Sequence, residues 1–114
     1  MIKVKRIYEK PTKEDGFRIL VDRLWPRGVK KEQAKVDLWL KDIAPSGNLR
    51  KWFSHKKERW KDFKIKYKEE LKSKAGLVKM IKDLEEKHGT ITLLFSAKDV
   101  EHNNAVVLLE ELTL

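Results

Sequence analysis

One uninterrupted run of apolar and β-branched residues stands out in the hydrophobic pattern of the chain. Thr90 to Phe95 contains no charged position, which is typical of a strand buried on both faces in the middle of a sheet. Polar residues then crowd the segment from Ser96 to Asn104. After it, apolar side chains return at helical spacing, at Ala105, Leu108, Leu109 and Leu112. The pattern predicts a central strand, a polar loop and an amphipathic final helix.

Two further strands are predicted near the start of the chain. Residues 2–8 alternate, with Ile2 and Val4 on one side and Lys3, Lys5 and Ile7 on the other, whereas residues 17–22 form a second apolar run. The connection over residues 10–16 is rich in turn-forming residues and too short to hold a crossover helix. This length favours an N-terminal hairpin over a parallel pairing.

Three helices are predicted between the second strand and the central one. The first begins after Ser46, which is a good N-cap; a longer one covers roughly residues 57–74, and a third ends at Gly89. Residues 29–45 are expected to be irregular or briefly helical. Buried strands combined with several helices predict a single α/β domain over residues 1–114, with a short, mostly parallel sheet and helices packed on it.

Two polar segments follow the two apolar strands and are the candidate binding site. If these strands run parallel, their carboxyl ends bring residues 22–28 and 96–104 together at one edge of the sheet. Guanidinium, ammonium and amide groups beside the start of a helix are suited to an anion, above all to a phosphate-bearing small molecule. The predicted ligand-binding residues are Arg23, Trp25, Arg27, Ser96, Lys98, Asp99, Asn103 and Asn104.

Acid–base chemistry at this site would fall to two candidate catalytic residues, His102 and Asp22. His102 is the only side chain in the two segments that exchanges a proton near neutral pH without a large pKa shift, and Asp22 or Asp99 could orient it or act as a base. The same residues could bind phosphate without any reaction, so the sequence leaves enzymatic activity open. No nucleotide, metal or nucleophile motif is present, and no cofactor or metal is predicted.

Structural roles compete with these functional ones. Asp22 and Arg23 could form an ion pair at the end of a strand, and Asp99 or Asn103 could do no more than cap the last helix. His55 follows apolar Phe53 in a lysine-rich turn and is interpreted as structural.

Charge and composition add a second candidate function. Residues 50–82 carry 13 basic and 4 acidic side chains, a net +9, whereas residues 83–114 carry a net −5. The lysine-rich helix within residues 50–74 could therefore serve as a nucleic-acid-binding module. Its aromatic residues share one stripe, which favours a core face and a solvated surface instead. A protein adaptor is a third possibility.

The cellular setting follows from what the composition excludes. The absence of cysteine rules out disulfides and thiolate chemistry. No run of 18 apolar residues is present, and the N-terminus lacks the apolar core of a signal peptide. We therefore expect a cytoplasmic protein without a membrane span, while the oligomeric state stays open.

Several stretches resemble a known family. These stretches are DGFRILVDRLWPRGVKKE, DLWLKDIAPSGNLRKWFSH, RWKDF with KYKEEL, and TLLFSAKDVEHNNAVVL. They resemble the YeaO-like proteins, domain of unknown function 488, and the likeness extends from Ile2 to Leu112. It implies a small cytosolic α/β protein without a settled activity. More distant members carry a cysteine in the loop that corresponds here to residues 96–99, so the resemblance implies the same site without thiol chemistry.

Overall fold

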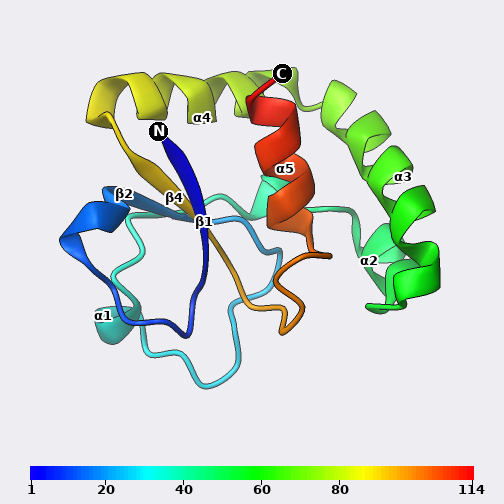
Figure 1. Ribbon diagram of the computed structural model, residues 1–114, viewed down its shortest axis with the longest axis horizontal. Coiled ribbons are helices and arrows are strands. Elements are labelled where there is room, and N and C mark those ends of the chain that lie inside the picture. The colour runs from blue at the N-terminus through cyan, green and yellow to red at the C-terminus, as the bar shows by residue number, and fades with distance from the viewer.

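A parallel sheet of four strands forms the centre of the computed structural model, which describes residues 1–114 (Figure 1). The strands are β1 (Ile2–Arg6), β2 (Phe17–Leu20), β3 (Leu38–Trp39) and β4 (Ile91–Phe95), in the spatial order β1-β4-β2-β3. The helices are α1 (Lys31–Ala34), α2 (Gly47–Phe53), α3 (Trp60–Lys72), α4 (Ala75–His88) and α5 (Asn104–Leu112). The predicted α/β fold with a parallel sheet and packed helices is confirmed.

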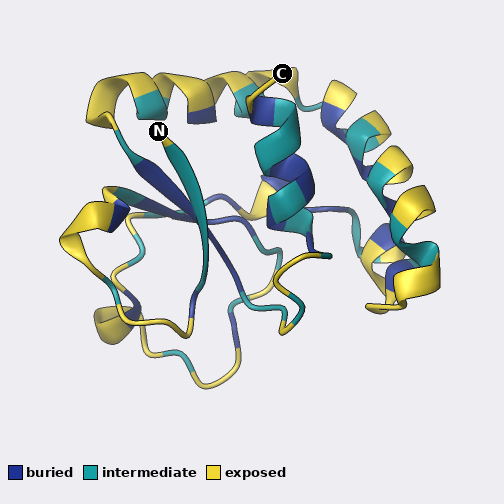
Figure 2. Ribbon diagram, viewed as in Figure 1, coloured by how far each residue is buried: buried dark blue, intermediate teal, exposed yellow.

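β4 lies inside the sheet, between β1 and β2, and both of its faces are covered. All five of its residues are buried, as Figure 2 shows. Leu93 belongs to the larger core on the side of α2 to α5, whereas Leu94 belongs to a smaller core on the other side, next to α1. The uninterrupted apolar run of the sequence therefore reflects a strand between two layers.

The predicted N-terminal hairpin is wrong. β4 lies between β1 and β2 and pairs with both in parallel. The connection over residues 7–16 crosses the second face of the sheet and returns to the start of β2. No helix is needed for this, because about ten extended residues reach roughly 33 Å, whereas a strand of five residues is only about 17 Å long.

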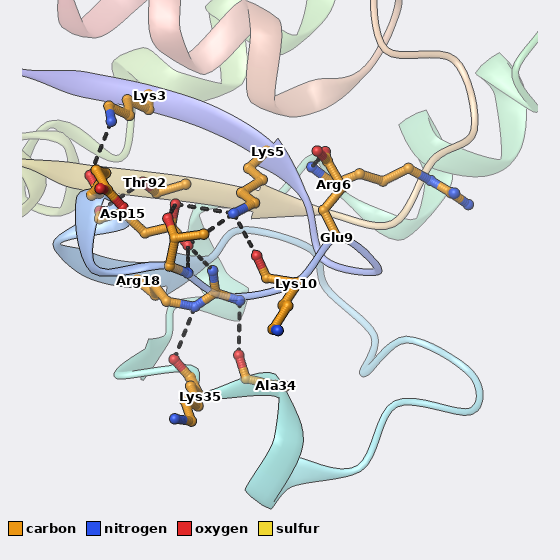
Figure 3. A network of polar contacts seen from close by, with 12 residues as sticks. Lys3, Lys5, Arg6, Glu9, Lys10, Asp15, Arg18, Ala34, Lys35 and Thr92 are labelled. Carbon is orange, nitrogen blue, oxygen red and sulfur yellow. Dashed lines mark hydrogen bonds and ion pairs between the residues drawn. The ribbon is translucent and has the colours of Figure 1, made fainter.

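A buried polar network holds this crossover against the sheet (Figure 3). The carboxylate of Asp15 accepts hydrogen bonds from Lys5 and Arg18, and both Asp15 and Arg18 are 4% exposed. Thr92 on β4 donates its hydroxyl to the carbonyl of Asp15 at 2.7 Å. Arg18 also donates to the carbonyls of Ala34 and Lys35. The crossover, the central strand and the end of α1 are thereby joined.

The sequence pattern did not predict β3. Its two residues pair with β2 in parallel, Leu38 beside Ile19 and Trp39 beside Leu20. So short a strand carries no periodicity of its own, and its position depends on β2. The predicted helices are present, with Ser46 capping α2 through its side chain as expected. No helix has the combination of length and apolar character that crossing a bilayer requires.

Candidate functional site

The two polar segments meet at the carboxyl edge of the sheet, as the parallel pairing of β2 and β4 requires. Asp22 accepts hydrogen bonds from the backbone N–H of Ser96 at 2.9 Å and from its hydroxyl at 2.7 Å. Asn104 donates its side-chain amide to Asp22 at 3.2 Å and to the carbonyl of Val21 at 2.9 Å. The loop after β2 is thus joined to the loop after β4 and to the start of α5.

A cavity of about 400 Å³ opens at this junction. Its walls come from the two loops and from α2, the turn after it, and α3. Among the predicted site residues, those that line it are Asp22, Arg23, Trp25, Arg27, Ser96, Asn103 and Asn104. Lys98, Asp99 and His102 do not line it. The loop after β4 therefore contributes its two ends to the cavity, while its middle lies elsewhere.

His102 is held away from the cavity by a local turn. Its Nδ1 lies 2.9 Å from the carboxylate of Asp99, and its backbone N–H donates to the same carboxylate at 3.1 Å. The imidazole ring also meets Trp60 of α3 edge-on, with 5.1 Å between ring centroids. A hydrogen bond from the backbone of Glu101 and the contacts with His102 lower the pKa of Asp99. The pair closes the loop onto α3.

Asp22 is a structural clamp between the two loops. Burial raises its pKa, while the hydrogen bonds from Ser96 and Asn104 and the positive potential of His55 oppose that rise. Ser96 and Asn104, two of the predicted ligand-binding residues, therefore donate to the carboxylate of Asp22 within the chain itself. The ion pair between Asp22 and Arg23, considered as a structural alternative, does not form.

Four cationic or protonatable side chains surround the cavity. Arg23 donates to the carbonyls of Pro45 at 3.1 Å and Ala44 at 3.2 Å, which fixes its guanidinium at the wall. Arg27, Arg50 and His55 are exposed and also line the cavity. None of the three arginines forms an ion pair within the chain. Asp22 is the only carboxylate in the lining.

Arg50 and His55 were missed as site residues from sequence. Ser54 and His55 both have positive φ, 43° and 55°, a left-handed conformation that non-glycine residues adopt at an energetic cost. This turn ends α2 and brings His55 against the ring of Phe53 at 5.8 Å, at the edge of the cavity. The sequence offered only one indication of their shared role: Arg50 lies in α2, and His55 lies in the turn that follows this helix.

Trp25 and Asn103 have mainly structural roles. The indole N–H of Trp25 donates to the carbonyl of Val29 at 2.7 Å, and its ring meets Trp39 edge-on in the smaller core. Asn103 is buried and accepts from the N–H of Val106 at 3.0 Å. Its side chain therefore caps α5, as the competing structural interpretation held. No three His, Cys, Asp or Glu side chains cluster in a way that could hold a metal ion.

Comparison with known proteins agrees with the motifs of the sequence. A family model described as the inactive DUF488-N3 subclade matches residues 1–114. The uncharacterised protein YeaO of Escherichia coli is 43% identical over 94% of this chain and 92% of its own length. An uncharacterised protein of Mycobacterium tuberculosis is 38% identical over 94% of this chain and 89% of its own. No solved structure matches. The chain belongs to the DUF488 family, within the subclade described as inactive DUF488-N3.

Proposed function

We propose that the cavity binds a small phosphate-bearing anion in the cytoplasm, and that the chain acts as a binding protein without catalysing a reaction. One observation carries the proposal: Arg23, Arg27 and Arg50 meet around one cavity with no carboxylate paired to any of them. Guanidinium groups that are not paired with a carboxylate of the chain are suited to binding phosphate, and bidentate binding is open to the exposed Arg27 and Arg50.

The surroundings of the arginines strengthen their attraction for an anion. The carboxylate of Asp22 is bound by Ser96 and Asn104, so it leaves the arginines available. Burial lowers the pKa of Lys74, and the positive charge of Arg23 lowers it further. Lys74 lies close behind the cavity, since it donates to the carbonyl of the lining residue Ala44 at 2.8 Å.

The case for binding over catalysis comes from the two catalytic candidates. His102 pairs with Asp99 and contacts Trp60 outside the cavity. Asp22 has both carboxylate oxygens engaged by donors from the chain. The description of the matching subclade as inactive supports the same view.

Thermal unfolding in the presence of inorganic phosphate, with chloride at equal ionic strength as the reference, tests the proposal. We expect phosphate at a hundred times its Kd to raise Tm by on the order of 5–10 °C. Arg27→Gln and Arg50→Gln should each lose most of this rise, because both side chains line the cavity. Lys61→Gln, an exposed substitution on α3, should retain it. Equal stabilisation of all four proteins, or of none, contradicts the proposal.

A second candidate is binding of a nucleic acid through the lysine-rich surface of residues 50–74. In its favour, Lys56, Lys57, Lys61 and Lys66 are exposed and form no ion pair, and Lys66 and Arg59 lie over the ring of Trp52. Against it, Lys64 and Lys68 pair with Glu110. Phe63 and Tyr67 are buried in the core and offer no surface for base stacking. We rank this function second.

A further inference from the structure

The cavity is too large for a phosphate group alone. Its volume is about 400 Å³, within the range of roughly 300–1,000 Å³ that small-molecule sites occupy. A bare phosphate bound by the arginines would leave most of this space to water. The remaining volume therefore belongs to the organic part of the ligand, and the lining residues indicate its chemistry.

One wall of the cavity is aromatic. Phe53 of α2 and Phe63 of α3 line it and stack on each other, with 4.3 Å between centroids and 21° between ring planes. They are only 5% and 2% exposed, so only a small part of each ring reaches the cavity. The ring of His55 packs on Phe53 and continues this wall to the mouth. Such a wall favours a flat aromatic group over a sugar.

The loop after β2 supplies an apolar lining side chain that stays exposed to solvent. Leu24, in the loop after β2, lines the cavity and is 60% exposed. The next residues along the same loop bring Pro26 into the lining as well. An apolar group bound in the cavity against Leu24 would remove this side chain from water, whereas folding leaves it exposed.

Charge and apolar surface occupy different depths. Arg27, Arg50 and His55 are exposed and therefore stand at the mouth, and so does the exposed Leu24. Phe53, Phe63 and Ala44 are buried and form the inner surface. A ligand that satisfies both layers has an anionic group at one end and an apolar ring at the other, with the ring innermost.

We infer that the ligand is a phosphomonoester that carries a flat aromatic ring. The ring lies on the inner surface formed by Phe53 and Phe63, Leu24 covers it from the side of the mouth, and the phosphate lies at the mouth among Arg27, Arg50 and His55. This inference rests on the proposed function and adds the class of ligand and its orientation.

Isothermal titration of the full chain with four probes tests the inference. AMP and phenyl phosphate carry both groups, ribose 5-phosphate lacks the ring, and adenosine lacks the phosphate. We expect the tighter of the two ring-bearing phosphates to bind at least ~10-fold more strongly than ribose 5-phosphate, since burying the apolar surface of a ring has about this effect. Adenosine should bind more weakly than AMP.

Leu24→Ser tests the position of the ring without risk to the fold, because this side chain is exposed. It should weaken the ring-bearing phosphates by ~3-fold or more and leave ribose 5-phosphate unchanged. Val100→Ser is the matched control, since Val100 is 59% exposed in the other loop and lies outside the cavity. It should change neither affinity.

The outcomes separate this inference from the proposed function. Equal binding of ribose 5-phosphate and the ring-bearing phosphates overturns the inference and leaves an anion site. Unchanged affinity in Leu24→Ser overturns the placement of the ring. Failure of all three phosphates to bind overturns both proposals.

Discussion

Asp15 and Asp22 are two carboxylates of one small domain whose pKa values shift in opposite directions. Burial raises the pKa of both. At Asp15, hydrogen bonds from Thr12, Lys5 and Arg18 outweigh burial and lower the pKa to about 2 from 3.8. At Asp22 burial dominates over the donors from Ser96 and Asn104. The two carboxylates thus differ in their donors: Asp15 has two charged ones, Lys5 and Arg18, whereas the donors to Asp22 are neutral.

Asp15→Asn should destabilise the chain in a pH-dependent way. Because the folded state lowers this pKa, the carboxylate stabilises the fold above about pH 4, and this contribution disappears as the pH falls toward 2. We expect the difference in unfolding free energy between wild type and variant to be on the order of 2 kcal/mol at pH 7 and to shrink below pH 4.

Urea denaturation at a series of pH values measures this difference. Asp83→Asn is the control, because Asp83 pairs with Lys79 on the exposed surface of α4, where an ion pair contributes at most about 0.5 kcal/mol. A difference for Asp15→Asn that is independent of pH between 2 and 7 would contradict the assignment.

The sequence could predict those polar contacts whose residues follow the carboxyl ends of parallel strands, because these ends lie at the same edge of the sheet. Asp22, Ser96 and Asn104 directly follow β2 and β4 or begin α5, so parallel pairing brings them together. His102 could not be placed in this way, because its pairing with Asp99 depends on a turn within the loop. His55 depends on a left-handed turn that no periodicity reveals.

At the scale of elements, the crossover between β1 and β2 determines the topology. The chain passes over the second face of the sheet and enters β2 through Gly16, whose φ is +64°. A Cβ at this position would lie 2.1 Å from the carbonyl oxygen of Thr90. Only glycine allows the crossover to approach the start of β4 so closely. The short connection between β1 and β2 therefore crosses over β4, with Gly16 allowing the close approach. Its length alone had favoured a hairpin.

Gly16→Ala should destabilise the fold by several kcal/mol, roughly 3 or more, because the added methyl group collides with backbone and not with a flexible side chain. Gly28→Ala is the matched control. Gly28 also has positive φ, 77°, but a Cβ there meets nothing within 4 Å, so the cost should be about 1 kcal/mol. Urea denaturation of both variants provides the comparison, and equal costs would argue against a close crossing.

Most elements could be predicted from local patterns, and the exceptions share one cause. β4 and α5 have strong patterns of their own, and α2 has a good N-cap. β3 has two residues and forms only because β2 offers an edge beside it. Its existence, like the position of the crossover, depends on partners distant in the sequence, which a local pattern does not contain.

At the scale of the whole molecule, basic side chains form two separate surfaces, one suited to a small anion and the other to a polyanion. The cavity uses arginines at the carboxyl edge of the sheet, whereas the lysine surface lies on α3 and the turn before it. The net charge of +9 attracts polyanions without specificity. Nucleic acid binding at this surface should therefore be weak and steeply dependent on salt, and independent of the cavity.

Substitution of Lys56, Lys57, Lys61 and Lys66 by glutamine tests this separation. We expect DNA affinity, measured by fluorescence anisotropy between 50 and ~200 mM salt, to fall and its salt dependence to flatten. Stabilisation by phosphate should persist in the same variant. Loss of phosphate binding together with DNA binding would mean that one basic surface accounts for both.

The central claim is that two loops after parallel strands, together with α2, form one site for an anion. Chemical-shift mapping of the ¹⁵N-labelled chain during titration with AMP tests it most directly. We predict saturable shifts of backbone amides within residues 22–28 and 50–55, at both ends of the loop over residues 96–104 and around Phe63, with little change along α4 and the rest of α3. Shifts confined to the lysines of α3 and α4, or no saturable shifts at all, would contradict it.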